Sequence, residues 1–192
     1  MSLAMTYSIF IDGAAGTTGL QVADRLARHP GVDARALSDE ERKDNAARQQ
    51  MMAASDLTIL CLPDVAAREA TAMAAQTNAR LIDASSAHRT HADWVYGFAE
   101  LIAGQRDAIA DASRISNPGC YPTGFLALTR PLVDAGIVPR DALLSVPAVS
   151  GFSGGGNGMI AQQADGALPV FGSYGVTLAH KHLPEMVAYA GL

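Results

Sequence analysis

The chain has 192 residues, of which 49% are apolar, 17% are charged and 6% are aromatic. This length predicts one domain, or two small ones sharing a core, and it suffices to bury most of the apolar surface. The 14 Lys and Arg residues against 19 Asp and Glu give a net charge of −5 without a basic run, so we expect no nucleic-acid partner, and no apolar stretch reaches the ~18 residues of a membrane span.

Short apolar runs alternate with helical patterns along the first half of the chain. The predicted strands are residues 8–12, 32–37, 57–62 and 81–83. The predicted helices are residues 17–29, 41–54 and 65–76, with Asp64 as the cap of the last. This alternation is typical of βαβ units, so we predict an α/β fold with a Rossmann-type parallel sheet over residues 1–117.

The pattern changes beyond residue 116. It predicts a helix over residues 121–135, strands over 143–149 and 176–182, and a glycine-dense loop over 151–158. These elements are few for an independent domain, although a boundary near residue 117 fits the change in pattern.

The N-terminus and the cysteines indicate the compartment. Residues 1–5 carry neither a basic segment nor an apolar core, so we expect no secretion signal, and Met5 suggests a leader ahead of the native start. Cys61 and Cys120 are too few for a disulfide framework, which favours the reducing cytoplasm.

A glycine turn joins the first predicted strand to the first predicted helix. Its sequence is Gly13-Ala14-Ala15-Gly16-Thr17-Thr18-Gly19. Small residues at this place let the backbone approach a pyrophosphate, and the amides of the helix start favour that anion. We predict cofactor binding here; the alternative is a turn that is merely tight.

The end of the second predicted strand bears on the choice between NAD and NADP. Ser38 with Arg42 or Lys43 favours the additional phosphate of NADP, whereas Asp39 is compatible with NAD. A solvated helix start with acidic residues in its first turn is the alternative. We predict NADP(H).

Cys120 precedes an apolar helix within Ser116-Asn117-Pro118-Gly119-Cys120-Tyr121-Pro122-Thr123-Gly124. A helix N-terminus favours the thiolate form of a cysteine. Such a thiolate attacks an acyl carbon while neighbouring amides hold the developing oxyanion. A buried structural cysteine is the alternative, and we assign that role to Cys61, inside an apolar run.

The segment His180-Lys181-His182-Leu183-Pro184-Glu185 is a second candidate. If it is extended, both histidines share one face, and a metal site becomes an alternative, although the sequence lacks further ligands at a convincing spacing. A histidine acting as acid and base beside the thiolate, oriented by Glu185, is the simpler interpretation. A pair of ordinary surface histidines is the third interpretation.

The chain resembles the N-acetyl-γ-glutamyl-phosphate reductases of the semialdehyde dehydrogenase family, particularly their shorter form. Besides the three segments quoted above, the resemblance rests on Asp83-Ala84-Ser85-Ser86-Ala87-His88-Arg89, Trp94-Val95-Tyr96-Gly97-Phe98 and Ala148-Val149-Ser150-Gly151-Phe152-Ser153-Gly154-Gly155-Gly156.

The resemblance implies NADPH-dependent reduction of an acyl phosphate to an aldehyde in arginine biosynthesis, by a homo-oligomer. Cys120 is then the nucleophile that forms a thioester, and His180 is the acid and base, with His182 the less favoured choice and Glu185 the orienting carboxylate. The remaining implied contacts are Arg89 and Asn117 on the substrate's phosphate or carboxylate, Ser85 and Ser86 beside the cofactor, and Ser153 and Gly154 on the acyl group.

Members of this family continue well past residue 192. We therefore expect residues 118–192 to form part of an α+β catalytic and dimerisation domain. We also expect this chain to expose apolar surface that the remainder would cover.

Three other functions remain open on the residues alone. An aspartyl or other acyl phosphate is chemically equivalent at the reacting carbon. Residues 151–155 fit the G-x-S-x-G pattern of a serine hydrolase, with Ser153, Asp165 and His180 as its triad. A non-catalytic scaffold that binds the cofactor is the third.

Overall fold

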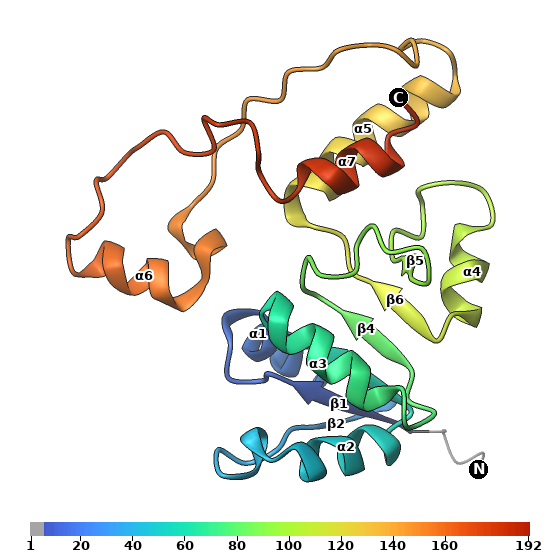
Figure 1. The fold of residues 1–192 in the computed structure, drawn as a ribbon, viewed down its shortest axis with the longest axis vertical. Coiled ribbons are helices and arrows are strands. Elements are labelled where there is room, and N and C mark those ends of the chain that lie inside the picture. Colours follow the sequence, from blue (N-terminus) through green and yellow to red (C-terminus); the bar gives the residue numbers. More distant parts are fainter. Residues whose placement is uncertain (1–5) are drawn as a thin grey trace.

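The computed structural model describes residues 6–192 (Figure 1). The interpretation of residues 1–5 lies outside the described residues. In the described part, six parallel strands form one sheet in the order β2-β1-β3-β4-β6-β5. The strands are β1 (Tyr7–Asp12), β2 (Val32–Arg35), β3 (Leu57–Leu60), β4 (Leu81–Asp83), β5 (Val95–Tyr96) and β6 (Arg114–Ser116).

The helices of the first half connect these strands as the alternation predicts. They are α1 (Thr17–Leu26), the 3-10 turn η1 (Glu41–Lys43), α2 (Asn45–Ala53), α3 (Asp64–Ala74) and α4 (Gln105–Asp111). The strand order reverses at β1, so right-handed crossovers place α1 on one face of the sheet and α2 with α3 on the other. The predicted Rossmann-type sheet is confirmed.

The core lies between the sheet and the pair α2 and α3. Phe10, Leu60 and Leu81 from three adjacent strands are almost fully buried against Met52 of α2. Burial of each such side chain contributes about 1.5–3 kcal/mol to folding. Alanines at positions 67, 70 and 74 form the buried stripe of α3, which lets this helix approach the sheet closely.

Several predicted boundaries differ from the structure. The predicted helix over 41–54 is divided, because the Asp44 carboxylate accepts a hydrogen bond from the Ala46 amide and starts a separate helix, α2. Asp64 is the first residue of α3 rather than its cap, which is Pro63. The sequence patterns predicted neither β5 nor β6, each only two or three residues long.

The second half contains α5 (Cys120–Asp134), the 3-10 turn η2 (Phe152–Gly155), α6 (Gly156–Ala164) and α7 (Leu183–Tyr189). Helices α5 and α7 lie side by side (Figure 1). The strands predicted over 143–149 and 176–182 are wrong. The first is an exposed extended segment without a paired neighbour among residues 6–192, and the second contains a turn in which the Leu178 amide donates to the Gly175 carbonyl.

The irregular part of the second half exposes apolar side chains. Leu143, Val170 and Phe171 are 100%, 92% and 81% exposed. The expectation that this chain exposes apolar surface is therefore met; what covers that surface stays a prediction. No helix within residues 6–192 is both long and apolar enough to cross a membrane.

The sheet brings three connecting turns to its carboxyl edge, as parallel strands require. The glycine turn follows β1, Ser85 and Ser86 follow β4, and the cysteine turn follows β6. The Asn117 amide donates to the Asp83 carbonyl at 2.7 Å, which fixes the cysteine turn to the end of β4.

A buried ion pair holds α2 to this edge. The Arg48 Nη2 atom lies 2.8 Å from Asp12 Oδ2, and the two side chains are 9% and 4% exposed. Arg48 Nε also donates to both Asp12 carboxylate oxygens. Asp12 ends β1 directly before the glycine turn, so this pair fixes where that turn begins.

We predict that Arg48→Ala lowers the free energy of unfolding by about 3–5 kcal/mol, because it leaves the Asp12 carboxylate buried without its partner. Urea denaturation followed by circular dichroism measures the change. The control is Arg28→Ala, which breaks an exposed pair with Asp24 and should change stability by less than ~1 kcal/mol. Equal effects of the two substitutions would contradict the prediction.

Candidate active site

The glycine turn has no room for side chains at two of its three glycines. A Cβ on Gly13 would lie 2.4 Å from the Cys61 carbonyl oxygen, and Gly13 has a φ of +90°. A Cβ on Gly19 would lie 2.3 Å from the Gly13 carbonyl oxygen, so this glycine sets the close approach of α1 to the turn. Both positions require glycine for the backbone path itself.

Gly16 has a different role, because it leaves space open beside the start of α1. A Cβ there would meet no atom closer than 3.5 Å. Gly16 is the N-cap residue of α1, without a side-chain cap and without an acidic residue in the first turn. The amides of Thr17, Thr18 and Gly19 begin the helix without a side-chain cap, so they lie at its positive end, which favours an anion, and Ala15 keeps the turn small.

The second half of the chain reaches the glycine turn. The Thr17 hydroxyl donates to Asn157 Oδ1 at 3.2 Å across 140 positions of sequence. Asn157 is the second residue of α6, so η2 and α6 lie against the start of α1. A ligand of the glycine turn would therefore contact both halves.

Residues predicted to select the cofactor lie together after β2. The Ser38 hydroxyl donates to Glu41 Oε2 at 2.8 Å and accepts from the Glu41 amide at 3.3 Å. Arg42 pairs with Asp39 at 3.0 Å, and the two side chains are 49% and 89% exposed. Lys43 is exposed. Ser38 and Arg42 thus both have carboxylate partners within this segment, and the exposure of Arg42 and Lys43 leaves both side chains accessible to an anion in solution.

The two serines after β4 are engaged with carboxylates. The Ser85 hydroxyl donates to Asp83 Oδ2 at 2.8 Å, and the Ser86 hydroxyl donates to Asp64 Oδ2 at 2.7 Å. Partial burial opposes ionisation of Asp64, but the hydrogen bonds from Ser86 and the charge of Lys181 outweigh it and lower the pKa. These contacts fix the loop at the edge of the sheet that carries the glycine turn.

Cys120 is exposed as the first residue of α5. It lies in a cavity that is otherwise lined by Tyr121, Val149, Ser150, Gly151, Ser153 and Gly154. The predicted nucleophile and the predicted substrate-binding residues Ser153 and Gly154 therefore share one cavity. In contrast, burial, followed by the charges of Asp12 and Asp83, raises the pKa of Cys61 to about 11, which suits a structural thiol.

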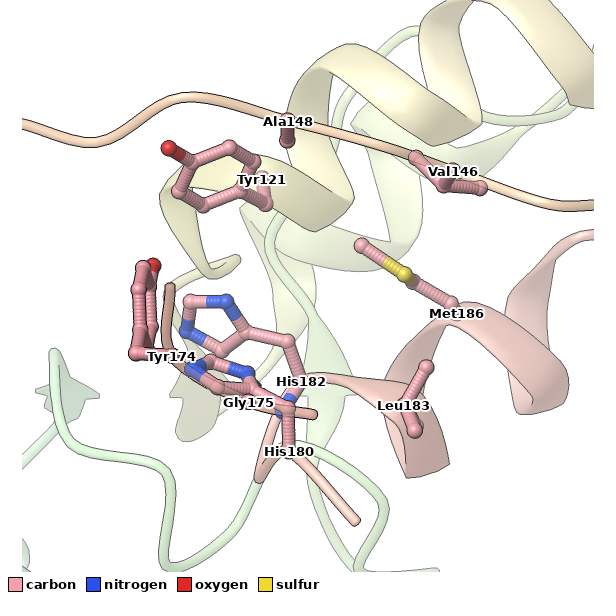
Figure 2. A pocket seen from close by; sticks show the side chains of 9 residues that line it. All are labelled: Tyr121, Val146, Ala148, Tyr174, Gly175, His180, His182, Leu183 and Met186. Atoms are coloured by element: carbon pink, nitrogen blue, oxygen red, sulfur yellow. Dashed lines mark hydrogen bonds between the residues drawn. The ribbon is translucent and has the colours of Figure 1, made fainter. Parts of the chain in front are cut away.

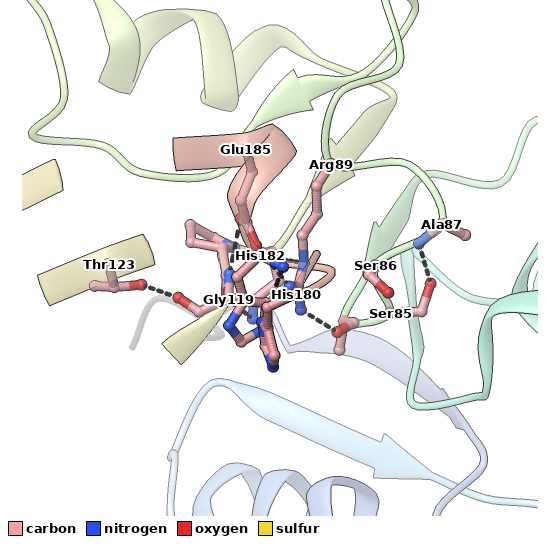
Figure 3. Close-up of polar contacts among 12 residues, drawn as sticks. Ser85, Ser86, Ala87, Arg89, Gly119, Thr123, His180, His182 and Glu185 are labelled. Carbon is pink, nitrogen blue, oxygen red and sulfur yellow. Dashed lines mark hydrogen bonds and ion pairs between the residues drawn. The ribbon is translucent and has the colours of Figure 1, made fainter. Parts of the chain in front are cut away.

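A buried carboxylate fixes the turn that carries Cys120 (Figure 3). Glu185 is 1% exposed and accepts hydrogen bonds from Arg89 Nη1 at 2.7 Å, the Tyr96 hydroxyl at 2.9 Å and the Gly119 amide at 3.1 Å. Burial and the charge of Glu185 raise the pKa of Tyr96, so this hydroxyl remains a donor. Glu185 therefore binds the backbone directly before Cys120.

Glu185 and Arg89 both make several contacts within the protein. Glu185 accepts from Arg89, Tyr96 and Gly119, and no hydrogen bond among residues 6–192 joins it to His180, so the orienting role expected for it stays a prediction. Arg89 is 9% exposed, and besides Glu185 it donates to the carbonyls of Asn117 at 3.1 Å and Ala84 at 3.2 Å. Its guanidinium thus makes three hydrogen bonds within the protein, and its expected contact with a substrate anion stays a prediction. The Asn117 amide group donates to the neighbouring Pro118 carbonyl, and this residue is exposed.

Sequence reasoning assigned no role to Tyr96, Gly119 or Tyr189. A Cβ on Gly119 would lie 2.5 Å from Glu185 Oε1, 2.6 Å from Arg89 Nη1 and 2.9 Å from His182 Nε2. The ring of Tyr189 stacks on that of Tyr96 with centroids 3.9 Å apart. The Trp94–Phe98 segment was the one signal for Tyr96, without an indication of its partner.

The two histidines line a second cavity. Their ring centroids are 4.7 Å apart, and the His182 amide donates to His180 Nδ1 at 3.2 Å. Tyr121 lines this cavity as well as the one at Cys120, so the two cavities are neighbours. Burial, followed by the charge of Arg89, lowers the pKa of His182 to about 4, so this ring is neutral at pH 7.

The serine hydrolase alternative is not supported. Its nucleophile requires a strand directly before the turn, whereas Ser153 lies in η2 after an irregular segment. The metal alternative has no support from the described residues either, since no group of three or more His, Cys, Asp and Glu gathers there to hold an ion.

Comparison with known proteins follows the same division of the chain. Residues 8–112 match the family model described as semialdehyde dehydrogenase, NAD binding domain, and residues 120–192 match semialdehyde dehydrogenase, dimerisation domain. The N-acetyl-gamma-glutamyl-phosphate reductase of Burkholderia ambifaria is 51% identical, over 100% of this chain and 61% of its own length. That of Brucella anthropi is 48% identical, over 98% of this chain and 62% of its own length. The chain therefore spans about three fifths of these relatives.

Solved structures share the fold at low sequence identity. An aspartate semialdehyde dehydrogenase II from Vibrio cholerae, complexed with ASA, superposes with a TM-score of 0.61 at 16% identity, over 88% of this chain and 55% of its own. The aspartate semialdehyde dehydrogenase from Francisella tularensis gives 0.61 at 15% identity, over 83% of this chain and 48% of its own. These likenesses establish the fold and leave the substrate open.

We predict that Gly119→Ala lowers the free energy of unfolding by at least about 2 kcal/mol, because the new methyl group would overlap the buried Arg89–Glu185 pair. Chemical denaturation measures the loss. Gly124→Ala in the same helix is the matched control, since a Cβ there meets no atom within 4 Å and should stabilise α5 by roughly 0.5–1 kcal/mol. A change in the free energy of unfolding with the same sign in both variants would contradict the prediction.

Proposed function

The chain belongs to the semialdehyde dehydrogenase family, and from that premise we propose that it is an NADPH-dependent N-acetyl-γ-glutamyl-phosphate reductase that works through a thioester on Cys120. The relatives named for this reaction match the whole chain at about 50% identity, which supports the substrate. The observation that carries the proposal is an exposed thiol at the start of α5, in a cavity next to two histidines.

The glycine turn fits a nicotinamide cofactor. The space beside Gly16 and the uncapped amides of α1 suit a pyrophosphate. Ser85 and Ser86 follow the neighbouring strands at the same edge and would line the rest of the site. When bound, the cofactor supplies the hydride that reduces the thioester.

Cys120 carries the covalent chemistry in this proposal. Its thiolate attacks the acyl carbon of the acyl phosphate, a carbon–sulfur bond forms, and inorganic phosphate leaves with the electron pair of the broken carbon–oxygen bond. Amides of the α5 N-terminus, where Cys120 is the first helical residue, would hold the developing oxyanion. Reduction of the thioester gives a thiohemiacetal, which collapses to the aldehyde and returns the thiolate.

His180 is the proton donor and acceptor for this collapse. It is half-buried and lines the cavity next to Cys120. Its ring packs edge to face against the ring of Tyr174, with the two ring centroids 6.2 Å apart. His182 is the poorer candidate, because its pKa is lowered to about 4, so the ring is a weak proton acceptor and carries no additional proton to donate at pH 7. Glu185 and Arg89 hold the Asn117–Cys120 turn in place rather than contacting the reacting atoms, and Asn117 remains the candidate for a substrate anion.

The proposal has three further parts: a boundary between two domains at residues 117 and 118, a homo-oligomeric assembly and a cytoplasmic location. The two family models support the division because they match on either side of it. The dimerisation-domain match supports a homo-oligomer. Two free thiols support a reducing cytoplasm.

We predict that Cys120→Ser lowers the rate of NADPH formation from the aldehyde and phosphate by on the order of a thousandfold or more, because a serine hydroxyl is not ionised at neutral pH. Nicotinamide absorbance gives the rate, and mass spectrometry of the acyl adduct locates the thioester. Cys61→Ser, at the partly buried second thiol, is the control and should keep most of the activity. Activity retained in Cys120→Ser would end the covalent mechanism.

We predict that Arg42→Ala weakens NADPH binding at least about tenfold, the effect of losing one hydrogen bond to a charged group, and leaves NADH binding unchanged. Fluorescence titration of the two cofactors gives both Kd values. Arg106→Ala, which removes an exposed arginine paired with Glu100, is the control. A parallel loss for NADPH and NADH would remove Arg42 from the choice of cofactor.

A further inference from the structure

A glycine-rich loop, residues 149–154, lines the cavity at Cys120 without support from regular strands. All residues from 143 to 151 are exposed, and none of them pairs as a strand within residues 6–192. Gly151 and the glycines at 154–156 have no side chains that could pack. A chain of this composition loses much conformational entropy when it is held in one position. Contacts with other elements must therefore hold this side of the cavity in place.

Tyr121 supplies such a contact at one end of the loop. Its hydroxyl donates a hydrogen bond to the Val149 carbonyl. Within residues 6–192, no other hydrogen bond joins residues 143–151 to a part of the chain distant in sequence. Tyr121 directly follows Cys120 in α5, so this bond fixes the loop relative to the residue next to the thiol.

The ring of Tyr121 is itself held by its surroundings. Tyr121 is half-buried, and its ring centroid lies 6.3 Å from that of His182, which is 8% exposed. Figure 2 shows the Tyr121 ring between the extended segment that carries Ala148 and the rings of the two histidines. A tyrosine side chain has two rotatable χ angles, so a ring held in place also fixes the position of its hydroxyl. Tyr121 is thus a short, stiff link between α5 and the loop.

A second contact holds the chain beyond the loop. The Thr17 hydroxyl, at the start of α1, donates to Asn157 Oδ1 at 3.2 Å. Gly156, directly before Asn157, has a φ of +75°, and a Cβ there would lie 3.6 Å from Thr17 Oγ1. The segment from Val149 to Asn157 therefore extends from the cavity at Cys120 to the glycine turn, and each of its ends has its own anchor.

We propose that Tyr121 is a positioning residue: its hydroxyl holds residues 149–154 beside Cys120, so that Ser153 and Gly154 meet the acyl substrate in one geometry. This inference rests on the proposed function. Tyr121 acts through the loop and not on the reacting carbon. Loss of its hydroxyl therefore weakens the binding of the acyl substrate more than it slows the chemical step, since Cys120 and His180 lie outside the loop.

The first test measures the order of the loop without turnover. Val149-Ser150 is the one Val-Ser dipeptide of the chain, so labelling with carbonyl-¹³C valine and ¹⁵N serine gives a single NMR correlation for it. In Tyr121→Phe, which keeps the ring, we expect the Ser150 amide order parameter to fall from about 0.85 to below about 0.6. Tyr7→Phe, at an exposed residue of β1, and Asn157→Ala, which releases only the other anchor, should leave it unchanged. An unchanged order parameter in Tyr121→Phe would overturn the proposal.

The second test distinguishes a positioning role from a merely structural one by the kinetics of the same variant. In Tyr121→Phe we expect the KM for the aldehyde to rise about fivefold, the effect of one hydrogen bond between neutral groups, while kcat and the KM for NADP change by less than about twofold. Tyr7→Phe should leave all three constants unchanged. A mobile loop together with an unchanged KM for the aldehyde would remove Tyr121 from substrate binding.

These outcomes are separable from those of the proposed reaction. A mobile loop and a raised KM in Tyr121→Phe, together with full activity of Cys120→Ser, would remove the thioester and keep the positioning role. Loss of activity in Cys120→Ser, together with an ordered loop in Tyr121→Phe, would do the reverse.

Discussion

The geometry of the candidate site depends on the hydrogen bonds that stabilise the negative charge of one buried carboxylate. Glu185 is withdrawn from water and accepts one hydrogen bond from each of three separate segments, through Arg89, Tyr96 and Gly119. Removing any donor would leave a buried charge partly unpaired, which costs far more than an exposed ion pair. The network therefore joins α7, the loop after β4 and the start of α5 into one unit, and it does so next to Cys120, the proposed nucleophile.

These hydrogen bonds fix the backbone before Cys120 and do not involve the Cys120 side chain. Arg89 holds the Asn117 carbonyl while Glu185 holds the Gly119 amide, so the peptide segment before Cys120 is fixed at both ends. A fixed helix start presents its free amides in one direction, as a developing oxyanion requires. Gly119 is the residue that permits it, because any side chain would occupy the place where Glu185, Arg89 and His182 converge.

Sequence patterns predicted the elements whose geometry depends on residues close to one another in the chain. The glycine spacing predicted the turn before α1, and the apolar run after Cys120 predicted α5, because in both cases neighbouring residues determine the geometry. The strand predicted over 143–149 has the composition of a strand but no paired neighbour within residues 6–192, and β5 and β6 are too short to show a period. The Arg89–Glu185 pair joins positions 96 apart, so a single sequence indicated both residues but neither partner.

The distribution of charge around the carboxyl edge is consistent with anionic ligands. Three buried carboxylates lie there: Asp12 is paired with Arg48, Glu185 is paired with Arg89, and Asp83 is hydrogen-bonded to Ser85 and His88. Uncompensated, their combined field would repel a pyrophosphate at the glycine turn and an acyl phosphate at Cys120. Because these carboxylates have partners within the protein, they do not bind the amides at the starts of α1 and α5. Those amides have no side-chain cap, so their dipoles stay available to an anionic ligand. The buried pairs thus fix the turns in space and also cancel the charge that would oppose binding.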